Sequence, residues 1–174
     1  QNGRWTVKTT IPEQGGYNMY VEVSPKEETT TILRMPLTIG GKTAQAKFPA
    51  INPNMIVSQD GVQLKLVTTS ALKTQEHTKL TFVLSRNGQP VTQIDPYLGA
   101  FGHVVVTRHG DPADYLHAHP LTDSKPINGQ VEFEAEFPAK GTYTLYAQFQ
   151  LNGKVATFPI TLAVNEEGQP AAEH

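Results

Sequence analysis

Hydrophobic and polar residues alternate along much of the chain, which is the period-2 pattern of a strand with one buried face. Apolar residues occupy every second position in residues 62–66 and 80–84, and residues 131–137 alternate without interruption. Residues 143–149 and 155–164 continue the series. No window combines the helical period with capping residues. The pattern therefore predicts an all-β protein.

Turn residues separate these strands at short intervals. Asn87-Gly88 and Asn152-Gly153 are strong hairpin signals, and Pro138-Ala139-Lys140-Gly141 forms another turn between two alternating runs. About seven strands fall within about 100 residues, which is the size of an immunoglobulin-like antiparallel β-sandwich. We expect residues 62–165 to form such a sandwich and residues 166–174 to form a flexible tail.

An internal repeat extends the prediction toward the N-terminus. Residues 2–23 match residues 128–149 at an offset of 126 (128 minus 2). Met35-Pro36-Leu37-Thr38 matches Phe158-Pro159-Ile160-Thr161 after a further shift of three residues. The matched positions include the pairs Gly3/Gly129, Gly15/Gly141, Tyr17/Tyr143, Met19/Leu145, Tyr20/Tyr146 and Val23/Phe149. We expect residues 1–47 to be the last three strands of a partial second copy, joined by a connector at 48–61.

Three strands are marginal as a fold of their own, because they cannot cover their apolar face. Two explanations are open. The favoured one is that the chain is cut from a longer protein with two repeats. The other is that the N-terminal strands complete a sheet elsewhere, as in a strand-swapped or domain-completed dimer.

Composition narrows the classes of function. The chain has 174 residues, 14 Lys+Arg, 16 Asp+Glu and a net charge of −2, which argues against a nucleic-acid partner. It has no Cys, so a metal site would have to use His, Asp, Glu or Met. No apolar run approaches the roughly 20 residues of a membrane span, so we do not expect a transmembrane protein. No signal peptide is visible at Gln1, which suits a cytosolic protein or the mature form of an exported one.

Four of the six histidines lie between residues 95 and 120. Gly110-Asp111-Pro112 is a turn signal, and a hairpin with a five-residue loop centred there would place Arg108 opposite Asp114. The same pairing would place Val105 opposite His117 and His103 opposite His119. His103, His117 and His119 would then share one face of the hairpin, with the apolar residues on the other.

Imidazoles at cross-strand spacing can converge on one metal ion. The alternative is that His117 and His119 cap the sandwich by hydrogen-bonding to loop carbonyls. Asp111 and Asp114 could supply a further ligand, although aspartates at such positions usually form turns. We expect His109 to be solvated in the turn and His77 to be an exposed loop residue before a strand.

Three segments resemble a group of bacterial exported β-sandwich proteins, the YtkA-like domains. They are Pro96-Tyr97-Leu98-Gly99-Ala100 followed by Gly102-His103, then Tyr115-Leu116-His117-Ala118-His119-Pro120, then Gly141-Thr142-Tyr143. The resemblance covers residues 62–164, and residues 1–40 as a partial second copy. It implies an immunoglobulin-like sandwich, a periplasmic or extracellular location and a role in metal handling, with His103, His117 and His119 as the residues carried over.

We therefore expect an exported, non-enzymatic sandwich that binds copper or zinc through these histidines. The alternative is a structural or interaction module of the cell envelope that binds no metal, with an envelope protein as its partner. The chain has no Ser/His/Asp arrangement with a nucleophile elbow and no carboxylate pair in an identifiable cleft, so the sequence gives an enzyme no support.

Overall fold

The computed structural model divides the chain into two compact units, Gln1–Phe48 and Pro49–His174. It describes residues 3–4, 6–11, 13–23, 31–41, 48–122 and 124–165, and of residues 112–114 it describes the backbone. The tail expected at 166–174 lies outside the described residues. Every regular element in the described part of the chain is a strand, so the all-β prediction is confirmed.

The first unit contains one antiparallel pair, β1 (Gly15–Val23) and β2 (Thr31–Ile39). Three strands were expected in residues 1–47, and within the described residues of this range the structure forms these two. Residues 6–11, which match the strand beginning at Gln130, are not in a strand. A strand is stabilised by pairing with a neighbour, and in the described residues the first unit offers this segment no pairing partner.

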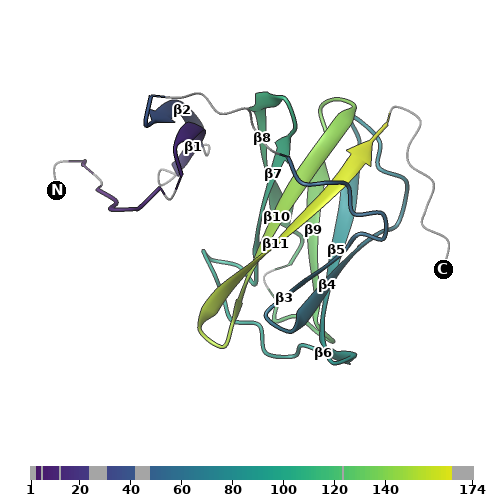
Figure 1. Ribbon diagram of the computed structural model, residues 1–174. Coiled ribbons are helices and arrows are strands. Elements are labelled where there is room, and N and C mark those ends of the chain that lie inside the picture. Colours follow the sequence, from purple (N-terminus) through teal and green to yellow (C-terminus); the bar gives the residue numbers. More distant parts are fainter. Residues whose placement is uncertain are drawn as a thin grey trace. The chain divides into compact units, whose positions relative to one another are not determined.

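The second unit holds a nine-stranded antiparallel sheet in the order β11-β10-β7-β8-β9-β5-β4-β3, with β6 paired to β5. Figure 1 shows these strands wrapped around a common interior, with the β7–β8 turn and β6 at opposite ends. This arrangement is consistent with the expected immunoglobulin-like sandwich. The bounds are β3 (Ile56–Gln59), β4 (Val62–Thr68), β5 (His77–Arg86), β6 (Gln89–Pro90), β7 (His103–Arg108), β8 (Asp111–Pro120), β9 (Gln130–Glu136), β10 (Gly141–Leu151) and β11 (Lys154–Val164).

The core follows from the alternation in the sequence. In β4, β5 and β9 every second side chain is buried, and the intervening ones face solvent or are half-buried. Phe82 of β5 packs against Phe149 of β10 with ring centroids 6.0 Å apart, so side chains from the two layers meet in one interior. Phe133 contacts Phe82 edge-on at 5.7 Å. Burial of these aromatic rings is the largest contribution that single residues make to such a core.

Asn52 holds the two edges of the sheet together. Its backbone N–H donates to the carbonyl of Thr161 over 2.8 Å, and its side-chain Oδ1 accepts from the Thr161 N–H over 2.7 Å. Thr161 belongs to β11 at one edge, and β3 at the other edge lies beside β11. The segment expected as a connector, 48–61, thus contains both this contact and β3. The sheet is nearly closed on itself, which leaves little unpaired edge.

Within the described residues, no helix is long and apolar enough to span a membrane.

Candidate functional site

The β7–β8 hairpin carries the histidines on the face away from the core. Val104, Val106 and Ala118 are fully buried, whereas His103 and His117 are half-buried and His119 is exposed. Val105 pairs with His117, as the proposed hairpin predicted. The ladder ends at the pair Val104–Ala118, so the expected pair of His103 and His119 lies one position beyond it.

The three imidazole rings form a contiguous row. The rings of His103 and His117 meet edge-to-face with centroids 4.5 Å apart, and a nitrogen of one lies within 4.8 Å of a nitrogen of the other. The rings of His117 and His119 are stacked, 5.6 Å apart and 5° from parallel. Metal–nitrogen bonds of about 2.1 Å hold two ligand nitrogens no more than about 4.2 Å apart. The nitrogens of His103 and His117 need to approach by no more than about 0.6 Å to reach that spacing.

His119 is less well placed for the same ion. Ligand nitrogens lie in the plane of an imidazole ring, so stacked rings do not direct them at a shared point. Among the described residues, the ring nitrogens of all three histidines do not come within 4.8 Å of one another. His119 would have to leave its stack on His117 to become a third ligand, and as an exposed side chain it has room to do so.

Tyr97 and Gly102 determine the surroundings of His103. Tyr97 contacts it edge-on with ring centroids 6.5 Å apart. Gly102 precedes it, and a Cβ there would lie 2.6 Å from the ring of Phe149. The start of β7 can therefore approach β10 only because residue 102 has no side chain.

The turn of the hairpin differs from the prediction. We expected a five-residue loop with Arg108 opposite Asp114. Instead Arg108 pairs with Asp111 across a turn at residues 109–110, and the register shifts between Thr107 and Arg108. Arg108 Nη2 binds Asp111 Oδ2 at 2.9 Å, which favours this tighter turn over the looser one. The Asp111 carboxylate is thus an ion-pair partner in the turn, and the side chain of Asp114 lies outside the described part of the chain.

The prediction of a solvated His109 was wrong. Its Nε2 lies 2.8 Å from Thr144 Oγ1, and Thr144 Oγ1 lies 2.8 Å from Thr161 Oγ1. Both threonines are almost completely buried. Burial lowers the pKa of His109 below its ordinary value of 6.5, because a charged imidazolium is poorly solvated there. His109 is therefore a packed residue in a hydroxyl chain, away from the row of histidines on the hairpin face.

Residues 57–166 match the family described as a domain of unknown function, DUF8832. The chain belongs to this family. The DUF8832 match begins in β3 and ends just after β11, so it takes in the histidine row and leaves out β1 and β2. No curated protein and no solved structure matches the chain. Its function must therefore be argued from the geometry of the DUF8832 domain.

Carboxylates lie next to the row in the DUF8832 domain. His119 pairs with Glu134 of β9, because β8 leaves β7 and joins β9 at this point. His77 is exposed as expected, but it is the first residue of β5 and not a loop residue. Its ring nitrogens lie 3.6 Å from Glu134 and 3.7 Å from Glu136. Sequence reasoning missed Glu134 as a neighbour of His119. Its alternation with buried residues put it on the outer face, but only the pairing of β8 with β9 brings the two together.

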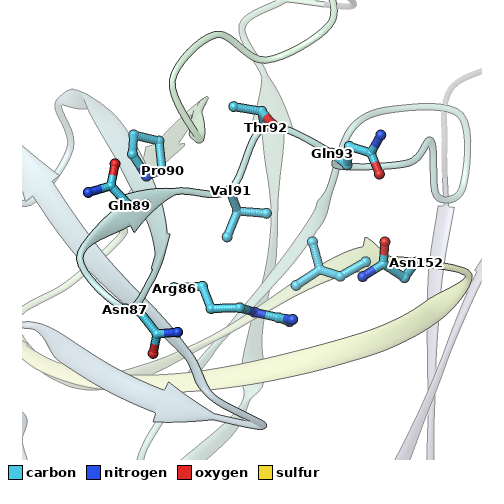
Figure 2. A pocket seen from close by; sticks show the side chains of 9 residues that line it. Arg86, Asn87, Gln89, Pro90, Val91, Thr92, Gln93 and Asn152 are labelled. Atoms are coloured by element: carbon cyan, nitrogen blue, oxygen red, sulfur yellow. The ribbon is translucent and has the colours of Figure 1, made fainter.

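A shallow groove at the β6 end of the DUF8832 domain is lined mainly by polar, uncharged side chains, with Arg86 and Asn152 on two of its sides (Figure 2). It contains no histidine or carboxylate among its lining residues. The groove therefore offers neither a metal ligand nor an acid–base pair, and the histidine row remains the candidate site.

Proposed function

We propose that the chain is an exported, non-enzymatic β-sandwich that binds a divalent transition metal, copper(II) or zinc, through His103, His117 and His119. The observation that carries the proposal is the contact between the imidazoles of His103 and His117, at 4.5 Å between centroids, on a hairpin with its apolar face in the core. The export part of the proposal rests on the resemblance to exported YtkA-like domains alone.

Imidazole nitrogen suits copper and zinc, and the histidine row contains no competing thiolate because the chain has no Cys. His103 and His117 form the primary pair, and His119 joins by rotating off its stack. Asp111 is held by Arg108, so the remaining coordination position is left to water or to a group from a partner. A metal binds the neutral imidazole, because a protonated ring has no free nitrogen lone pair, so we expect affinity to fall in acid.

The proposal is tested by thermal unfolding with and without Cu²⁺ or Zn²⁺. A ligand at 100 times its dissociation constant stabilises the folded state by about 2.7 kcal/mol. We expect a clear rise in Tm for the wild type and none for the double variant His117→Ala/His119→Ala. The matched control is His77→Ala, which removes an exposed histidine from the same sheet and leaves the row intact. A wild-type Tm that neither metal changes would overturn the proposal.

A second function is favoured by the ring contacts themselves. Tyr97 contacts His103, His103 contacts His117, and His117 stacks on His119, so the row also ties the loop before β7 to β8. A structural or interaction module of the cell envelope would need only this link between the loop and β8, and no metal. It predicts that the double variant loses stability to the same extent with and without metal, whereas the metal-site proposal predicts that the loss grows when metal is added.

A further inference from the structure

The repeat in the sequence is also a repeat in local geometry. Tyr17 donates its hydroxyl proton to the carbonyl of Glu13 over 2.8 Å, and Tyr143 donates to the carbonyl of Ala139 over 2.6 Å. Each tyrosine bonds four residues back, in the manner of the tyrosine corner of immunoglobulin-like sandwiches. Two residues before each tyrosine a glycine has nearly the same unusual φ, 156° at Gly15 and 153° at Gly141. The start of β1 is therefore built as the start of β10 is.

Burial separates the two copies. Leu145, Phe149 and Phe158 are completely buried in the second unit. Their counterparts in the first unit are Met19, Val23 and Met35, which are 40%, 42% and 41% exposed. The matched positions thus belong to the core in one copy and to an exposed apolar face in the other. An apolar face of this kind marks a surface made to be covered.

The segment before β1 shows the same contrast. Val7 matches Phe133 of β9, which is completely buried and lies in a strand paired with β5 and β8. Val7 is 86% exposed and lies in a segment that forms no strand. What the first copy lacks, within the described residues, is the equivalent of the strands from β3 to β8.

We propose that β1, β2 and the segment at 6–11 before them belong to a second sandwich of this fold. Strands equivalent to β3–β8, carried ahead of them on the same polypeptide, cover their apolar face. In the second unit, residues Tyr143–Gln148 of β10 pair with β7. By the offset of the repeat, residues 17–22 of β1 present the corresponding edge to a β7-type strand.

The order of strands in the repeat favours upstream strands, and not a second copy of the chain, as the cover of this apolar face. In the second unit β3–β8 precede β9–β11, so in a tandem repeat their equivalents precede residue 4. A second copy has no such strands to spare, because its own β7 already pairs with both β8 and β10. Its sheet is also closed through Asn52 and Thr161.

The test is hydrogen exchange of the β1 amides, read by mass spectrometry, in two polypeptides: the present chain, and the chain extended by the residues encoded upstream of Gln1. We expect exchange in residues 17–22 to slow by at least about 100-fold on extension. Met19→Glu, on the apolar face, should abolish that protection. Asn18→Glu, on the opposite face of β1, should leave it in place.

Two outcomes would overturn the proposal. One is equal exchange of β1 in the two polypeptides, which includes the case of an upstream sequence without the matching strands. The other is protection in the present chain that grows with protein concentration, since the occupant would then be a second copy. Exchange in β10 serves as the internal reference, because the extension should leave it unchanged.

Discussion

Replacing Asn52 with alanine should weaken the closure of the sheet. Asn52 Oδ1 accepts the N–H of Thr161 over 2.7 Å, and the two residues are 109 positions apart in the chain. Alanine keeps the backbone bond from the Asn52 N–H to the Thr161 carbonyl but removes the side-chain acceptor. The backbone N–H of Thr161 would then be left without that partner in a residue that is 0% exposed.

The size of the effect follows from this burial. An ordinary hydrogen bond contributes about 1 kcal/mol net, but a buried donor left without an acceptor costs about 1–3 kcal/mol. We therefore expect Asn52→Ala to lower the free energy of unfolding by about 2 kcal/mol. Asn52→Asp keeps an acceptor oxygen at the same position and should recover more than half of the loss.

The assay is equilibrium unfolding in urea, followed by tyrosine fluorescence, to which the buried Tyr143 contributes. Asn54→Ala is the matched control, because Asn54 lies in the same segment and is exposed. It should change the midpoint little. The reasoning is refuted if Asn52→Ala loses no more stability than Asn54→Ala, or if the aspartate variant is as unstable as the alanine variant.

Three further variants test other parts of the account. Because burial lowers the pKa of His109, the unfolded state takes up a proton before the folded state does as pH falls below 6.5. The stability of the wild type should therefore drop between pH 7.5 and 5.5 more steeply than that of His109→Gln. Urea unfolding measures this, and an equal drop in the free energy of unfolding of both proteins would contradict the reasoning. Gly102→Ala should cost about 1–3 kcal/mol, because the new Cβ overlaps the ring of Phe149; an unchanged Tm would contradict that close approach. Tyr143→Phe removes the hydrogen bond to the Ala139 carbonyl and should lower the free energy of unfolding by about 1 kcal/mol, measured by thermal unfolding. A variant as stable as the wild type would show that this hydrogen bond does not stabilise the fold.

Strand positions could be predicted because alternation is a local property. The runs at 62–66, 80–84 and 131–137 all lie within strands or reach just past one, as their pattern indicated. The face shared by His103 and His117 was predictable for the same reason, since two strands joined by a short turn must pair.

Features that depend on distant residues could not be predicted. The tighter turn arises from the ion pair of Arg108 with Asp111, which a turn signal alone does not reveal. The burial of His109 depends on Thr144 in β10, and closure of the sheet depends on Asn52 meeting β11. Each of these contacts joins groups whose proximity is set by packing and not by local pattern.

The most direct test of the proposed metal site is calorimetric titration of the wild type with Cu²⁺ and with Zn²⁺ at pH 7.5, repeated with His103→Ala. The account predicts saturable binding of one ion per chain to the wild type, with affinity at least about tenfold weaker in the variant, a loss of about 1.4 kcal/mol. His77→Ala should bind as the wild type does. No saturable binding of either metal, or binding that survives the loss of His103 unchanged, would contradict it.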